Sequence, residues 1–186
     1  PQAYWEWFAQ ENAREGVAPN AAHRFVASLE QDGKLSAVVT QNIDGLHQRA
    51  GSKRVLELHG NWSRLTCTGC GEHFTLNDVD DARSGSVPHC PTCASVLRPD
   101  IVFYGEMLDS DVIEGAVRAI TEADLLIVAG TSLVVHPAAG LIDYYTGERL
   151  VLMNATSTPY DSRADLIIRE PVGQVFHELE RLRPRP

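Results

Sequence analysis

The four cysteines of this chain have the type and spacing of metal ligands. They occur as two C-x-x-C pairs, Cys67 with Cys70 and Cys90 with Cys93. Two cysteines in one tight turn can direct both thiolates at a single metal ion, and two such pairs supply the tetrahedral set of sulfurs that zinc prefers. Because protein side chains fill all four positions, none is left for water or substrate. The spacing therefore predicts a structural Zn²⁺ site.

Two other uses of the cysteine pairs fit the pattern less well. Disulfides are uncommon in a chain whose sequence shows no recognisable secretion signal. A redox-active C-x-x-C pair would not need a second copy. His73 and His89 flank the pairs and could substitute as ligands. With four cysteines available, we expect both histidines to be ordinary polar residues.

The composition is that of a globular protein, with 44% apolar and 22% charged residues. A net charge of −9 argues against a general nucleic-acid binder, which usually has a basic face. An acidic chain would suit a lysine-rich partner, although many proteins are acidic for solubility alone. No run of roughly 18 apolar residues occurs, so we expect no membrane span. Without a visible targeting signal, and with thiols arranged for metal, a cytoplasmic protein is expected.

Around the cysteines, short apolar runs alternate with amphipathic segments. The expected strands are residues 35–40, 55–58, 124–129, 150–153 and 165–168. The expected helices are residues 4–14, 19–32, 44–50, 109–123, a helix beginning at Pro137, and residues 172–182. This alternation indicates an α/β fold with a parallel sheet covered by helices on both faces. The polar segment 61–98 interrupts the pattern and is expected to be a small inserted zinc-binding module.

Polar residues follow several of the predicted strands where each strand ends. In open α/β sheets, ligands bind beyond the carboxyl ends of the strands, so these residues are candidates for one site. They are Gln41, Asn42 and Asp44 after the first strand, His59 after the second, Gly130, Thr131 and Ser132 after the third, and Asn154 after the fourth.

Each candidate has an ordinary structural alternative. The backbone N–H groups of residues 130–132 suit a phosphate or ribose, but a plain strand-to-helix turn has the same composition. Asp44 could instead cap the helix that follows it, and Asn154 could simply close a turn. His59 is the best acid–base candidate because imidazole exchanges protons near neutral pH, although a lone histidine is more often structural.

Several motifs together match one enzyme family. They are TQNIDGLHQRAG at residues 40–51, LHG at 58–60, the two cysteine pairs, RPDIVFYGE at 98–106 and GTSLVVHPAA at 130–139. In this order, and over nearly the whole chain, they resemble the sirtuins of bacterial and archaeal type. Sirtuins are NAD-dependent protein-lysine deacetylases of the transferase class.

The resemblance implies a Rossmann-like NAD-binding domain with a smaller zinc and helical module, and substrates bound in the cleft between them. We expect residues 35–60 and 99–186 to form the NAD-binding domain, residues 61–98 the zinc-binding module, and residues 1–34 a helical part of the small module. The family begins with a strand and a Gly-Ala-Gly loop that holds the pyrophosphate. Nothing in residues 1–34 matches these, so we expect the chain to be part of a longer protein.

The resemblance also implies a role for each candidate residue. His59 matches the catalytic base. The NAD contacts are Gln41, Asn42, Asp44, Gly130, Thr131, Ser132 and Asn154. The contacts to the acetylated-lysine protein or peptide are Val102, Phe103, Gly105 and Glu106 on one side, and Leu133, Val134 and Val135 on the other. The peptide would then lie between two strands as an added strand.

The implied reaction removes acetyl groups from protein lysine and gives nicotinamide and O-acetyl-ADP-ribose. Asn42 and Asp44 are expected to hold the nicotinamide carboxamide, and His59 to take a proton from a ribose hydroxyl. Two alternatives stay open. The first is a mono-ADP-ribosyltransferase that uses the same cofactor site, and the second is an inactive zinc-bearing interaction module that lacks the phosphate loop.

The sequence also predicts an acyl preference. Sirtuins that favour acidic acyl groups carry a Tyr-x-x-Arg pair in the helix before a Pro-Asn dipeptide. Counting back from Pro19-Asn20 places Trp7 and Gln10 at those positions. No arginine is there to pair with a carboxylate, so we expect deacetylation rather than desuccinylation.

Overall fold

The computed structural model describes residues 1–12, 17–79 and 81–183, and its contacts divide the chain into two compact units. The smaller unit consists of Pro1–Ala18, Asn42–Gly45 and His59–Met107. The larger unit consists of Pro19–Gln41, Leu46–Leu58 and Leu108–Pro186. Neither unit is a continuous segment, because the chain passes between them several times. In the part of the chain that the structure describes, no helix has both the length and the apolar character needed to cross a membrane.

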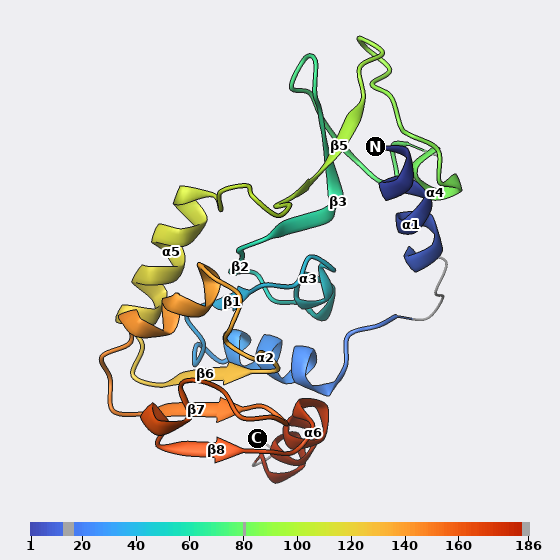
Figure 1. The fold of residues 1–186 in the computed structure, drawn as a ribbon. Coiled ribbons are helices and arrows are strands. Elements are labelled where there is room, and N and C mark those ends of the chain that lie inside the picture. The colour runs from blue at the N-terminus through green and yellow to red at the C-terminus, as the bar shows by residue number, and fades with distance from the viewer. Residues whose placement is uncertain (13–16, 80, 184–186) are drawn as a thin grey trace. The chain divides into compact units, whose positions relative to one another are not determined.

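The larger unit combines helices with short parallel strands. Its helices are α2 (Ala21–Gln31), α3 (Leu46–Ala50), α5 (Ser110–Thr121) and α6 (Val172–Leu182), with the 3₁₀ helices η1 (Ala138–Tyr144) and η2 (Asp161–Arg163). Its strands are β1 (Val38–Thr40), β2 (Val55–Glu57), β6 (Leu126–Ala129), β7 (Leu150–Met153) and β8 (Leu166–Ile168). Every pair among these strands is parallel, which confirms the predicted α/β fold class (Figure 1).

The strands of the larger unit form two sheets rather than one. β1 pairs with β2, and β6, β7 and β8 pair in that order. Within the described residues, no strand pairs with the second edge of β1 or of β6, so hydrogen bonds do not join the two sheets. On one face of the larger sheet, Ile127 and Leu166 are 38% and 52% exposed. Both flank Val151 in the strand register, so they share that face of the sheet.

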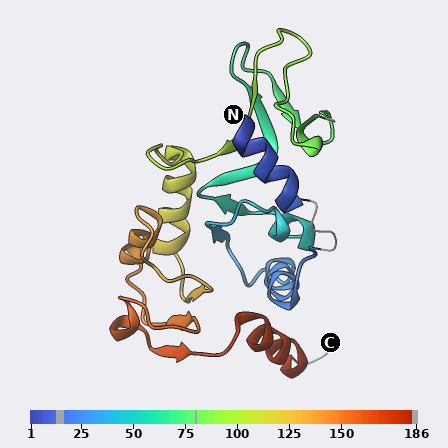
Figure 2. The same ribbon diagram turned by 45° about the vertical axis from the view of Figure 1, so that its right-hand side comes forward.

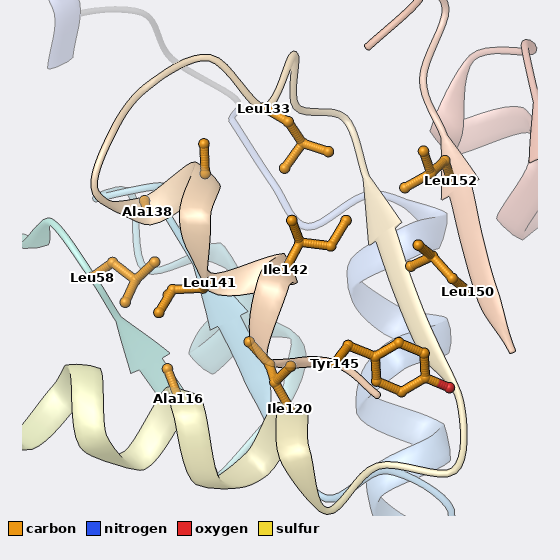
Figure 3. Packing of buried hydrophobic residues seen from close by; sticks show 11 residues of the cluster. Leu58, Ala116, Ile120, Leu133, Ala138, Leu141, Ile142, Tyr145, Leu150 and Leu152 are labelled. Carbon is orange, nitrogen blue, oxygen red and sulfur yellow. The ribbon is translucent and has the colours of Figure 1, made fainter. Parts of the chain in front are cut away.

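The other face of this sheet packs into the main hydrophobic core. Leu150 and Leu152 of β7 meet Ile142 of η1 and Ile120 of α5, and all four side chains are almost fully buried. Figure 3 shows these side chains converging from the strands and helices around them. Tyr145 closes one end of the cluster, with its hydroxyl directed at the main chain.

Helix boundaries follow from side-chain caps that the sequence makes visible. Asn20 caps α2 by accepting the N–H groups of Ala22 and His23 at 2.9 and 3.2 Å, and Asp109 caps α5 in the same way. The helix expected to begin at Pro137 is a 3₁₀ helix that begins one residue later. Pro137 is its N-cap, a position where the missing N–H of proline costs no helical hydrogen bond.

The smaller unit has an antiparallel sheet and two helices. Its elements are α1 (Gln2–Asn12), β3 (Gly60–Cys67), β4 (His73–Thr75), α4 (Asp81–Ser84) and β5 (Leu97–Ile101). The central strand is β3, which pairs with β4 on one side and with β5 on the other. Figures 1 and 2 both show β3 and β5 as the long strand pair of this unit. Trp5 and Phe8 of α1 pack against Leu65 and Leu97 of these strands, and all four are essentially inaccessible.

The contacts divide residues 1–34 between the two units. The sequence alone predicts that this whole segment belongs to the small module. α1 lies in the smaller unit, where its aromatic side chains fill the core. α2 lies in the larger unit, where Phe25 packs against Phe176 of α6 with ring centroids 5.5 Å apart.

Candidate active site and metal centre

The four cysteine sulfurs gather at one end of β3. All four lie within 4.8 Å of one another. Cys67 Sγ is 3.4 Å from Cys93 Sγ, and Cys70 Sγ is 3.7 Å from Cys90 Sγ. Zinc–sulfur bonds in a tetrahedron place sulfurs about 3.8 Å apart, whereas a disulfide needs about 2 Å. The geometry therefore fits a zinc ion and confirms the predicted four-cysteine metal site.

Hydrogen bonds give the thiols different proton affinities. The Cys70 N–H donates to Cys67 Sγ at 3.4 Å and lowers the pKa of Cys67. The hydroxyl and N–H of Ser95 lower the pKa of Cys93 to about 6. The Glu72 N–H acts to lower the pKa of Cys70, but hydrogen bonding with Cys67 and burial outweigh it and raise that pKa to about 12. Without a cation the cluster is thus only partly deprotonated, and a bound metal charge would complete the deprotonation.

His59 immediately precedes β3, beside the first residues that pair with β5. Its carbonyl oxygen accepts the N–H of Val102 at 3.0 Å. The next residue, Gly60, has φ of +77°, and a Cβ there would lie 2.0 Å from the carbonyl oxygen of Asp100. A glycine is required because no side chain fits so close to the facing backbone. The structure thereby joins the candidate base to the segment predicted to bind the peptide.

That segment continues from β5 into a tight turn at Phe103–Glu106. The Glu106 N–H donates to the Phe103 carbonyl oxygen at 3.0 Å, and Gly105 has φ of +88°. The Glu106 carboxylate accepts the N–H of Phe103 at 3.0 Å. It also forms an ion pair with Arg98, and these two donors lower the pKa of Glu106. Tyr104, at the tip of the turn, is fully exposed.

The loop with Asn42 and Asp44 belongs to the same unit as His59. The carbonyl oxygen of Ile43 accepts the N–H of Trp62 at 3.2 Å, which fixes the loop against β3. Gly45 has φ of +66° and lies against the buried Asn61, whose Nδ2 would be 3.3 Å from a Cβ at Gly45. The side chains of Asn42 and Asp44, the candidates for binding an amide group, therefore lie in the same unit as His59.

The remaining cofactor candidates lie in the larger unit, Gln41 after β1 and the others after the neighbouring strands β6 and β7. Ala129 and Met153 are paired in the parallel register, so Gly130 and Asn154 follow the strands β6 and β7 at the same level. The Gly130 N–H donates to Met153 O at 2.9 Å. The Asn154 amide donates to the carbonyl oxygen and hydroxyl of Thr156 at 3.0 and 3.2 Å. These bonds fit the alternative that Asn154 closes a turn.

The three candidate peptide contacts after Ser132 differ in how exposed their side chains are. Leu133 is 5% exposed and packs in the main core, so its side chain is not available to a ligand. Its φ of +54° is unusual for a leucine. Val134 and Val135 are 59% and 46% exposed. A peptide contact by this segment therefore requires the two valines or the main chain.

The sequence model of the Sir2 family matches residues 1–137. The chain belongs to the Sir2 family. It is 49% identical over 173 residues to an NAD-dependent protein deacetylase of Clostridium acetobutylicum, which covers 93% of this chain and 70% of the relative. It is 47% identical over 161 residues to one of Staphylococcus aureus, which covers 87% of this chain and 65% of the relative.

Solved Sir2 structures share the fold. One that contains Sir2, a p53 peptide and NAD⁺ has a TM-score of 0.83 and 42% identity, and the match covers 92% of this chain and 75% of that one. Another, of Sir2 bound to a propionylated peptide, has a TM-score of 0.86 and 41% identity, and covers 97% and 78%. The predicted family is thereby confirmed.

The strand ends of this Sir2 chain have donors that suit a nucleotide. Gly130 and Ser132 are exposed and Thr131 is half-buried, so the loop after β6 presents small residues with two hydroxyls. Gly130 has φ of +67°, which favours glycine and opens the turn. Hydroxyls and the Asn154 side-chain amide suit the oxygens of a ribose.

Two residues of this Sir2 chain take positions that its motifs do not predict. Arg98 begins the motif RPDIVFYGE, and it reaches Glu106 at the other end because the chain turns at Gly105. Asn61 follows the LHG motif and is only 4% exposed, and its Oδ1 accepts the Ser63 N–H at 2.9 Å. The signals available were opposite charges at the two ends of RPDIVFYGE and an asparagine adjoining His59-Gly60.

Proposed function

We propose that this chain removes acetyl groups from protein lysine in an NAD-dependent reaction that yields nicotinamide and O-acetyl-ADP-ribose. The observation that carries the proposal is the 3.0 Å hydrogen bond between Val102 and His59 in a chain of the Sir2 family. It ties a candidate base to a candidate peptide-binding segment within one unit. The relatives named NAD-dependent protein deacetylase support the same reaction.

The residues of the smaller unit take the chemical roles in this proposal. NAD, when bound, supplies a ribose carbon that accepts the acetyl oxygen as nicotinamide departs. His59 accepts a proton from a ribose hydroxyl, which turns that hydroxyl into a nucleophile. Asn42 and Asp44 hold the carboxamide of nicotinamide, because an amide ligand needs both a donor and an acceptor.

Residues at the strand ends of the larger unit bind the rest of the cofactor. Thr131 and Ser132 contact it through N–H and hydroxyl groups, Gly130 leaves room for it beside the main chain, and Gln41 and Asn154 offer amides. The peptide binds by strand addition to residues 102–106, with Val134 and Val135 as further contacts. The zinc is structural, because four thiolates leave no coordination position for a substrate.

The test is an assay with an acetyl-lysine peptide and NAD, in which nicotinamide release and O-acetyl-ADP-ribose are measured by mass spectrometry. His59→Ala should lower turnover by at least about 100-fold, the contribution of a general base. His177→Ala, which removes an exposed imidazole from α6, is the matched control and should leave turnover unchanged. Full activity of His59→Ala would refute the catalytic role.

The same assay separates the two alternatives. Transfer of ADP-ribose to protein without loss of acetyl groups would favour a mono-ADP-ribosyltransferase. Intact NAD and intact peptide would favour the inactive interaction module.

We also propose a cytoplasmic location. Four thiols placed to ligate one metal need a reducing compartment to stay free of disulfides. Cell fractionation tests this, and recovery of the protein outside the cytoplasm would contradict it.

A further inference from the structure

One carboxylate oxygen organises the turn at Phe103–Glu106. Glu106 Oε2 accepts the Phe103 N–H at 3.0 Å and also accepts a hydrogen bond from Arg98 Nη2. The same Arg98 nitrogen donates to the carbonyl oxygen of Ile101 at 3.3 Å. The guanidinium thus connects the last residue of β5 to the last residue of the turn.

The aromatic ring of Phe103 is held by two further groups of the smaller unit. The Arg98 guanidinium carbon lies 5.0 Å from the ring centroid, within the range of a cation–π contact. The ring of Tyr4, from α1, meets it edge-on with centroids 5.6 Å apart. Arg98 therefore contacts the turn at its ring and its carboxylate and also contacts the strand before it.

These contacts are poorly placed to stabilise the fold. The side chains of Arg98 and Glu106 are 44% and 38% exposed. Ion pairs as open as this contribute little to folding because water screens them and two long side chains must be ordered. A planar guanidinium is, however, well suited to fixing geometry, since its donors have fixed directions.

We propose that Arg98 is a positioning residue for the acetyl-lysine peptide. It holds the turn, through Glu106 and Phe103, in the conformation that receives the peptide as an added strand. The inference rests on the proposed function, because it assigns Arg98 to the peptide site of that reaction. Arg98 touches neither the cofactor nor the reacting atoms in this role, so it governs peptide affinity and not the chemical step.

Steady-state kinetics with an acetyl-lysine peptide test the inference. Arg98→Met removes the charge and keeps most of the side-chain length. It should raise the peptide KM about tenfold while kcat and the KM for NAD stay within about twofold, the pattern of a lost ground-state contact. Arg98→Lys keeps a point charge without the fork of donors and should give an intermediate KM.

A matched control exists in the larger unit. Arg163 forms an ion pair with Asp143 at similar exposure, 39% and 57%, and its guanidinium lies 5.6 Å from the ring of Tyr160. Arg163→Met removes the same kinds of contact away from the turn. It should leave the peptide KM unchanged, which shows that the effect is specific to Arg98.

Two further measurements separate positioning from general damage. The Phe103 amide should exchange hydrogen faster in Arg98→Met, while zinc content and melting temperature remain those of the unmodified chain. The effects of Arg98→Met and Glu106→Gln on the peptide KM should not be additive, because both substitutions remove the same ion pair.

Each outcome decides the question. A peptide KM within about twofold of the unmodified value in Arg98→Met, or a fall in kcat and melting temperature without a change in KM, overturns the inference and leaves the proposed function intact. Failure of the unmodified chain both to turn over and to bind a fluorescent acetyl-lysine peptide overturns both.

Discussion

The main-chain N–H of Val102 donates a hydrogen bond of 3.0 Å to the carbonyl oxygen of His59. Next to it, Gly60 pairs with Ile101 in the same antiparallel ladder. The distance between the proposed base and the proposed peptide segment is therefore set by backbone pairing within the smaller unit. A change that disturbs this ladder should affect folding and catalysis together.

Gly60→Ala should be strongly destabilising. Its Cβ would lie 2.0 Å from Asp100 O and 2.9 Å from Asp100 C, and the residue would also keep φ near +77°. The two strands would have to separate, and we expect a loss of more than about 3 kcal/mol in the free energy of unfolding. Denaturant unfolding measures this loss.

Gly33→Ala is the matched control for this substitution. Gly33 has φ of +68° but has no atom within 4 Å of its Cβ position. It should lose only about 1–2 kcal/mol, the backbone term alone. Equal losses at the two glycines would show that the close approach to Asp100 is unimportant.

Loss of zinc should unfold the smaller unit selectively. Cys67 is 2% exposed and belongs to the core of that unit, so Cys67→Ser should release the metal and loosen residues 61–98. The core around Leu152 contains none of these residues and should keep its protection from hydrogen exchange. His89→Ala should retain zinc. Loss of the metal from that variant would indicate that His89 is a zinc ligand.

The same site predicts how zinc affinity depends on pH. Cys70, with a pKa near 12, holds its proton at neutral pH, whereas Cys93, with a pKa near 6, has lost most of its own. Zinc binds thiolates, so binding at pH 7 releases protons and the affinity should fall as the pH falls. Competition with a chromophoric chelator at pH 6, 7 and 8 measures it. A zinc affinity that does not change with pH would contradict the release of thiol protons on binding.

Tyr145→Phe should destabilise the larger unit. The buried Tyr145 hydroxyl lies 3.1 Å from Asp124 O and from Arg149 O, and it accepts the Arg149 N–H at 3.1 Å. Removing it takes a hydrogen-bond partner from the Asp124 carbonyl and the Arg149 N–H, at a cost of about 1 kcal/mol. Tyr144 is 52% exposed, and Tyr144→Phe should change stability by less than about 0.5 kcal/mol. Thermal unfolding of the two variants decides between them.

The acyl preference is a kinetic prediction. Trp7 is 47% exposed and Gln10 is also exposed on α1, and neither side chain can form a charge-assisted pair with a carboxylate. Acetyl peptides should therefore have a higher kcat/KM than succinyl peptides of the same sequence. Faster turnover of the succinyl peptide would refute the assignment of these positions.

The sequence by itself determined the features that depend on local spacing. The two C-x-x-C spacings are enough to predict the metal cluster, because in each pair a short turn brings both thiols to the same side. Parallel strands end at one sheet edge, a rule that holds without coordinates, and it places Gly130 and Asn154 at the same level after β6 and β7.

The tertiary structure decided the relationships between residues on different strands and turns. The β3–β5 register shifts between Asn61 and Leu65, and this shift cannot be read from either strand alone. It sets which residue faces Gly60 and where Arg98 stands. The contact of Arg98 with Glu106 and the burial of Leu133 also depend on backbone φ values at Gly105 and Leu133 itself. Such contacts come from folding the whole chain, because residues far apart or in a strained turn meet only once packing has fixed the backbone between them.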